Sequence, residues 1–224
     1  MPHHYRSAIA RAAARAAAQI RGPADPPGGP RDDRRGQALG TAFLDVVRAA
    51  VVIARELQLD ASWVVTVVAR AAAESNATYR LPTYAENATA RGVYQYNNAA
   101  HAETVRPTAG YWWGLGGGGV YAQEIGQVAE VARSFGADWR DDDAGEIVVP
   151  LLQYAVIARE MIRRHAPNAG RLWLLLSHWH WSPGHGLRDV VRGRPMTGRR
   201  AEWHQARMSQ VTAHARESLR ALLG

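Results

Sequence analysis

The sequence has no cysteine, no lysine and no long apolar run. Without cysteine, disulfide bonds and thiol chemistry are excluded. All 27 basic residues are therefore arginine, which we attribute to coding bias and not to a mechanism. Because no apolar stretch reaches the roughly 18 residues that a membrane-spanning helix needs, no membrane span is expected. With 47% hydrophobic and 21% charged residues, the composition is that of a globular protein.

The net charge of +7 is concentrated at the two ends of the chain. Residues 1–36 hold seven arginines against three acids, and residues 188–224 hold eight against three. The middle, residues 37–187, holds twelve arginines against fourteen acids. Basic ends suit an anionic partner such as cell wall, nucleic acid or a membrane surface, and they equally suit simple solubility.

Breaker residues and charge divide the chain into three parts. An Ala/Arg-rich helix is predicted over 4–21, and the proline- and glycine-rich GPADPPGGPRDDRRG that follows cannot continue a helix or a central strand. We expect residues 1–36 to form a basic, solvated arm with a linker. Residues 37–187 are expected to form one domain, and 188–224 a basic C-terminal helix.

Helical periodicity dominates the middle of the chain. Apolar residues recur at helical spacing over 40–58 and 60–74, and further helices are predicted over 120–135, 145–165 and 169–181. No alternating apolar–polar run with hairpin signals occurs. We therefore predict an all-α fold with at most a small hairpin between residues 75 and 100.

Glu74 stands at an unusual place, the end of the second of these helices. Asp60 provides a helix start signal, and a stripe of apolar residues leads from it to Glu74: Trp63, Val64, Val67 and Ala71. Desolvation and the helix macrodipole would both favour the protonated form of an acid there. The alternative is an ion pair with Arg70, four residues earlier, worth a few tenths of a kcal/mol on a helix surface.

The order of Glu74-Ser75, a breaker-rich loop and then Gly92-x-x-Gln95 resembles the lysozyme-like superfamily, most closely the lytic transglycosylases and phage lysozymes. The resemblance implies a helical lysozyme-like domain that cleaves the glycan strands of peptidoglycan. By position it implies Glu74 as general acid/base and Ser75 as its hydrogen-bonding neighbour. It places Gly92 and Gln95 in the second motif, with Tyr94 and Gln95 binding the sugar or steadying the charged transition state.

Aromatic residues outside these two motifs supply further candidates for sugar binding. In transglycosylases a late helix typically carries an Ala-Tyr-Asn segment that faces the acid; here that segment is absent, and either His178 and Trp179 or Trp181 would take its place. Trp112 and Trp113, beside a run of glycines, either form a sugar-stacking wall or fill the core.

The second carboxylate of the site is an open question. A hydrolase commonly needs a pair of carboxylates, whereas a lytic transglycosylase works with one. Glu86 is either that second carboxylate or an ordinary loop acid. Because Ala-Arg-Gly-Val-Tyr-Gln over 90–95 is also similar to a segment of plant-type chitinases, a chitinase-like hydrolase using Glu74 and Glu86 is a further alternative.

No metal or other cofactor is expected. His178, His180 and His185 do not converge on one side of a helix, and no cluster of acids completes a ligand set. The acid run Asp141 to Asp143 lacks calcium-loop spacing and is expected to complement the start of the following helix.

Three functions follow from these features. The first is an enzyme, a transglycosylase or muramidase whose partner is peptidoglycan. The second is a non-catalytic tail or particle component of a phage-like assembly. The third, a nucleic-acid binder using the basic ends, ranks last because no helix-turn-helix pattern with a basic second helix occurs. The N-terminal stretch lacks the apolar segment of a secretory signal, so delivery by a phage-like particle or a holin is expected.

Overall fold

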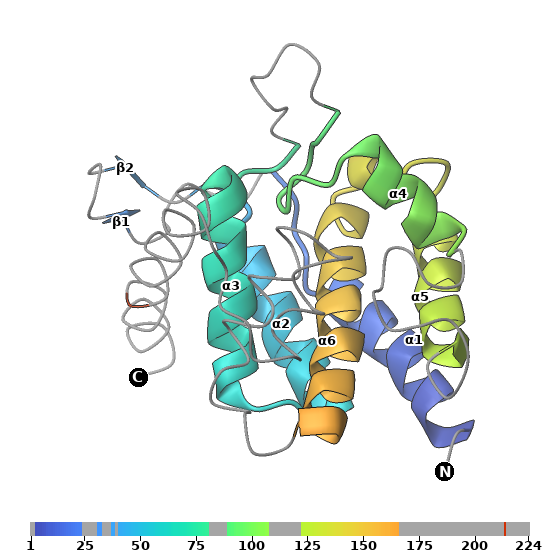
Figure 1. Cartoon of the computed structure of the whole chain (residues 1–224). Helices are drawn as coiled ribbons and strands as arrows, with labels where there is room; N and C mark the ends of the chain where they lie inside the picture. The colour runs from blue at the N-terminus through green and yellow to red at the C-terminus, as the bar shows by residue number, and fades with distance from the viewer. Residues whose placement is uncertain are drawn as a thin grey trace, which may run out of the picture.

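The computed structural model describes residues 3–23, 31–32, 37–38, 40–80, 89–107, 122–165 and 213. Within these ranges the chain is helical, which confirms the predicted all-α class, and no helix there could cross a bilayer. The elements are α1 (His3–Ala17), β1 (Arg31–Asp32), β2 (Gln37–Ala38), α2 (Phe43–Leu57), α3 (Ala61–Ser75), α4 (Asn98–Val105), α5 (Ala122–Ser134), the 3-10 helix η1 (Trp139–Asp141) and α6 (Gly145–His165) (Figure 1). Strands β1 and β2 form a two-residue antiparallel ladder.

Most of the predicted helices are present. Those predicted over 40–58, 60–74, 120–135 and 145–165 are α2, α3, α5 and α6. The helix predicted over 169–181 lies outside the described residues, as does the C-terminal helix apart from Ala213, which is helical. Helix α4 was not predicted; it begins where the Asn97 side chain accepts the Ala100 N–H at 2.7 Å.

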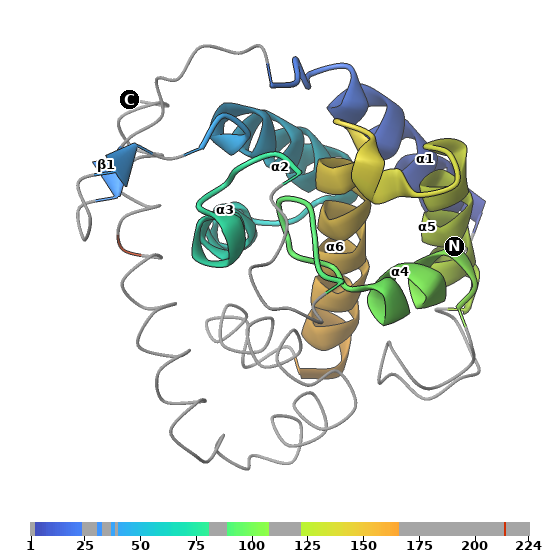
Figure 2. The same cartoon turned by 90° about the horizontal axis from the view of Figure 1, so that it is seen from above.

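Helix α6 is the central element of the fold. It packs against α1, α2, α3 and α5, and the views from the side and from above both place it between α3 and α5 (Figures 1 and 2). Residues 145–158 are all buried, as expected for a helix that is apolar on every side. Asp142 caps its start by accepting the N–H groups of Ala144 and Gly145 at 2.9 and 2.7 Å, which confirms the role expected for the acid run. Pro150 lies inside the helix.

Helix α1 belongs to the core, which corrects the expectation of a solvated arm over 1–36. Ile9 and two alanines of α1 have no exposed surface, and the helix packs on α2, α5 and α6. The apolar face is mostly alanine, and this small side chain lets helices approach closely. The alanine face of α1 is therefore buried, although its low hydrophobicity had predicted a solvated helix.

Asp45 of α2 joins the end of α1 to the segment after α3. Its side chain is fully buried, and its Oδ2 accepts the N–H groups of Arg21 and Gly22, each at 3.1 Å. The same oxygen accepts the Tyr79 hydroxyl at 2.5 Å. Gly22 has a φ of +82°, and a Cβ there would lie 2.6 Å from Oδ2 of Asp143, so this turn requires glycine.

Ile9→Ala is expected to lower the free energy of unfolding by about 2 to 5 kcal/mol, because it removes buried methylene and methyl groups from the α1 interface. Ala10→Ser, on the exposed side of the same helix, is the control and should change it by about 0.5 kcal/mol or less. Urea unfolding followed by circular dichroism measures both. Equal, negligible effects would mean that α1 does not contribute to the core.

Candidate functional site

A tight hairpin over residues 91–96 lies at the centre of the candidate site. Arg91 and Tyr96 exchange backbone hydrogen bonds at 3.1 and 3.0 Å, and the Gln95 N–H donates to the Gly92 carbonyl at 3.1 Å. This is the small hairpin expected between residues 75 and 100. In Figures 1 and 2 the segment passes over one end of the bundle, between α3 and α6.

Ser75 joins the end of α3 to this hairpin. The buried Ser75 Oγ donates to the Val93 carbonyl at 2.7 Å and accepts the Thr78 N–H at 3.2 Å. Helix α3 ends immediately afterwards, where Asn76 takes a left-handed conformation with φ of 55°. The structure therefore brings Glu74-Ser75 and Gly92-x-x-Gln95 together, although sixteen residues separate the two motifs.

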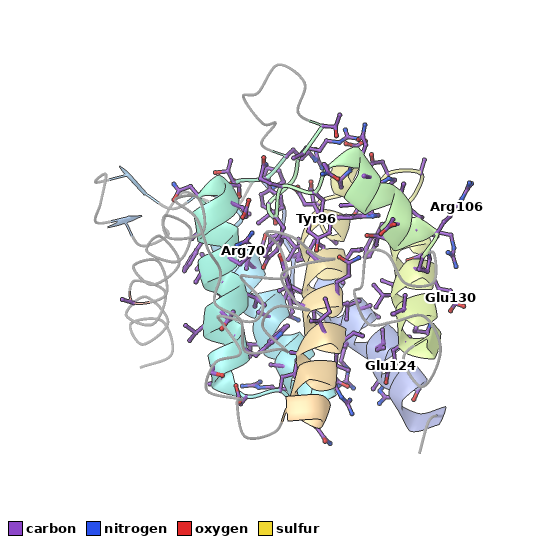
Figure 3. All side chains as sticks on the ribbon, viewed as in Figure 1. Arg70, Tyr96, Arg106, Glu124 and Glu130 are labelled. Atoms are coloured by element: carbon purple, nitrogen blue, oxygen red, sulfur yellow. The ribbon has the colours of Figure 1, made fainter. Side chains whose placement is uncertain are left out.

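Glu74 is paired with Arg70. The Arg70 Nη2 lies 2.5 Å from Oε1 of Glu74, and the side chains are 4% and 19% exposed respectively. Glu74 is thus not an isolated acid in apolar surroundings; the ion pair considered as the alternative is present. It is a half-buried pair and not a surface one, because Arg70 lies on the side of α3 that faces α6 (Figure 3).

Three tyrosines of the hairpin and α6 are buried close to Arg70 of this pair. The Tyr94 hydroxyl donates to the Val67 carbonyl at 3.0 Å, and its ring packs 5.5 Å from that of Tyr154. The Tyr154 hydroxyl lies close to Tyr96 and to Arg70 and interacts with both. Burial raises the pKa of all three hydroxyls well above the ordinary value. Tyr94, expected to touch a sugar, is instead a core residue bonded to α3.

The two motif residues of the turn have internal roles in the hairpin. Gly92 has a φ of +82°, and a Cβ there would meet Oε2 of Glu146 at 3.2 Å. Gln95 also has a positive φ, 53°, and its side-chain amide donates to the Gly92 carbonyl at 2.9 Å. The positive φ at Gly92 favours glycine, and the Gln95 side chain fixes the turn.

Arg140 of η1 supports the other side of the hairpin. Its buried guanidinium donates to the Tyr96 carbonyl at 2.9 Å and to Oδ1 of Asn98, also at 2.9 Å. Asp138 receives hydrogen bonds from Arg140 and from Arg91. Although burial raises the pKa of the Asp138 carboxyl, hydrogen bonds from Arg140 hold it well below its usual range. The hairpin is therefore anchored to η1 as well as to α3.

Glu146 was not anticipated from the sequence. It lies in the first turn of α6, is 1% exposed, and its Oε2 accepts the N–H groups of Arg80 and Val93 at 2.9 and 3.1 Å. Burial raises the pKa of Glu146 from 4.5 to about 8, against the opposing effect of these two hydrogen bonds. The one sequence feature that could have indicated a buried acid here is its position immediately before a long apolar run.

The remaining candidates lie outside the described residues: Glu86, Trp112, Trp113, His178 and Trp179. Within the described ranges no group of three or more histidine and acidic side chains is arranged to hold a metal ion. No protein-family model, no curated protein and no solved structure matches the chain.

Ser75→Ala is expected to lower the free energy of unfolding by about 1 to 3 kcal/mol, because it leaves the buried Val93 carbonyl without its donor. Ser134→Ala is the matched control: its Oγ also donates to a carbonyl at 2.7 Å, but Ser134 is exposed, so water replaces the lost bond. Urea unfolding of both variants gives the comparison. If the two losses were equal, the Ser75 bond would add nothing to the docking of the hairpin.

Proposed function

We propose that the chain cleaves the glycan strands of peptidoglycan, with Glu74 as the general acid/base. The observation that carries this proposal is the 2.7 Å hydrogen bond from Ser75 to Val93. It holds the residue after Glu74 against the turn that contains Gly92 and Gln95. The order of the two motifs is weak evidence by itself, and their contact in the folded chain supports the proposal.

In the proposed reaction Glu74 donates a proton to the glycosidic oxygen as the bond to the sugar carbon breaks. The sugar's own 6-hydroxyl then closes a 1,6-anhydro ring and returns its proton to Glu74, or a water molecule attacks and a reducing end forms. Arg70 acts as a positioning residue by fixing the carboxyl through Oε1. When Glu74 carries the proton, the ion pair with the Arg70 guanidinium must weaken.

A second carboxylate is required only for the hydrolytic route. Glu146 does not fit that role, because it is buried and its Oε2 is bonded to two backbone N–H groups. Glu86 remains the candidate for hydrolysis, either of peptidoglycan or of a chitin-like glycan. Trp112, Trp113, His178 and Trp179 remain proposed sugar contacts, together with the partly exposed Gln95.

A second candidate function is glycan binding without cleavage, as in a component of a phage-like particle. Two contacts favour it: the guanidinium on Glu74, and the Gln95 amide turned back onto the Gly92 carbonyl. Both satisfy the motif side chains inside the protein. The two candidates differ in whether these contacts open when a glycan binds.

Digestion of purified peptidoglycan distinguishes the two candidates. Wild type is expected to release soluble fragments, and Glu74→Gln to lose on the order of 10²- to 10⁴-fold in rate, the contribution of a positioned acid. Glu130→Gln makes the same chemical change on the outer side of α5 and should retain the wild-type rate (Figure 3). Circular dichroism checks that every variant is folded.

Mass spectrometry of the fragments then identifies the reaction. Products lighter than hydrolysed fragments by one water indicate the 1,6-anhydro product and a lytic transglycosylase. Full-mass reducing ends indicate hydrolysis, and Glu86→Gln should then also be inactive. Equal release by wild type and Glu74→Gln contradicts the assignment of the acid. Tight binding of peptidoglycan without fragments from either supports the non-catalytic candidate.

A further inference from the structure

The backbone of Val93 is held at its N–H and at its carbonyl by side chains of two different helices. Ser75, the last residue of α3, donates to its carbonyl at 2.7 Å, and Glu146, in the first turn of α6, accepts its N–H at 3.1 Å. Gly92 lies so close to Glu146 that a Cβ would meet Oε2 at 3.2 Å. The carboxyl is therefore directly beneath the turn.

Glu146 holds a second segment with the same oxygen. Oε2 also accepts the N–H of Arg80, in the chain that leaves α3, at 2.9 Å. Oε1 is buried and has no hydrogen-bond partner among the residues that the structure describes. Among the residues that the structure describes, the charged or titratable groups that face the carboxyl are Arg80, Asp143 and Tyr79, and Arg80 is itself paired with Asp143.

We propose that Glu146 is a positioning residue that fixes the 91–96 hairpin against the end of α3, and that ionisation of its carboxyl releases the hairpin. The clamp itself follows from the contacts above. Its effect on cleavage rests on the proposed function, since the hairpin carries Gln95. A released hairpin separates the two motifs, because Gln95 then moves away from the end of α3 that carries Glu74.

The direction of the pH dependence follows from burial. The docked carboxyl keeps its proton up to a pKa of about 8, whereas a hydrated carboxyl in the opened hairpin loses it near the ordinary value of 4.5. Docking is therefore fully stable below about pH 4.5 and weakens as pH rises towards the folded pKa. Between these values the opening equilibrium grows by roughly tenfold for each pH unit.

Amide hydrogen exchange of Val93 and Arg80 tests the clamp. After correction for intrinsic base catalysis, wild type should lose protection at these two amides by roughly tenfold per pH unit between about pH 5 and pH 7. Glu146→Gln keeps an oxygen acceptor but cannot ionise, so its protection should not vary with pH. Ser75→Ala should lower the protection factors of both amides by the same factor at every pH, so that their dependence on pH stays that of wild type.

The proposal is overturned if wild-type protection shows no slope beyond base catalysis, or if Glu146→Gln keeps the slope. Should Glu146→Gln not fold, wild type alone decides: the carboxyl carbon shift of Glu146 and the amide shifts of Val93 and Arg80 should titrate together, with a midpoint above the ordinary 4.5 and no higher than about 8. A carboxyl that titrates near 4.5 overturns it.

Activity provides a readout that a purely structural role would not change. If wild type cleaves peptidoglycan, Glu146→Gln should flatten the fall of kcat/KM towards alkaline pH while Glu130→Gln retains it. If kcat/KM of Glu146→Gln falls towards alkaline pH as steeply as that of wild type, Glu146 does not control the proposed site. If wild type does not cleave at all, the proposed function fails, and amide exchange still tests the clamp on its own.

Discussion

The fold depends on satisfying the backbone of a hairpin that is buried between helices. Gly92, Val93, Tyr94 and Tyr96 are buried, and a buried N–H or carbonyl without a partner costs about 1 to 3 kcal/mol. Within so short a hairpin, the only backbone hydrogen bonds are the two between Arg91 and Tyr96 and the one from Gln95 to Gly92 inside the turn. The other groups require side chains from elsewhere, and three separate elements supply them: Ser75 from α3, Glu146 from α6 and Arg140 from η1. Docking of the hairpin is thus a result of tertiary assembly and not of local preference.

This requirement explains why polar residues occupy otherwise apolar elements. Glu146 precedes a run of α6 that is buried on every side, and Asp45 is a fully buried acid in α2. Each accepts backbone N–H groups from segments that pack at the same end of the bundle. Tyr79 lies between the two acids: its hydroxyl donates to Asp45, and its pKa is raised mainly by burial, then by Asp45 and to a smaller extent by Glu146. Since a buried polar side chain is costly unless hydrogen bonds satisfy it, such residues fix one arrangement of the loops more strictly than apolar packing alone.

The sequence could predict those helix boundaries that depend on apolar periodicity and on local signals such as caps and breaker residues. The start of α3 at Asp60, its end after Glu74, and the extents of α2, α5 and α6 follow from apolar spacing, caps and breakers. Helix α4 was missed because its eight residues show little separation of apolar and polar faces. The burial of α1 was missed because an alanine face gives a weak hydrophobic signal although it allows close packing. Glu146 could not be assigned a partner, since Arg80 and Val93 lie 66 and 53 residues away and only the folded chain brings them near.

The two glutamates of this region have opposite relations to the hairpin. Glu74 lies beside it and bonds to a side chain of its own helix, whereas Glu146 lies beneath it and bonds to its backbone. A change at Glu74 therefore alters the charge next to the turn and leaves the turn in place, because Ser75 and Glu146 still hold Val93. In the proposed clamp, a change in the protonation of Glu146 instead alters the position of the turn, because the carboxyl bonds to the turn's own backbone. If the proposed function holds, chemistry and placement fall to separate carboxyl groups, and pH acts on the arrangement of the proposed site through a residue that is 1% exposed.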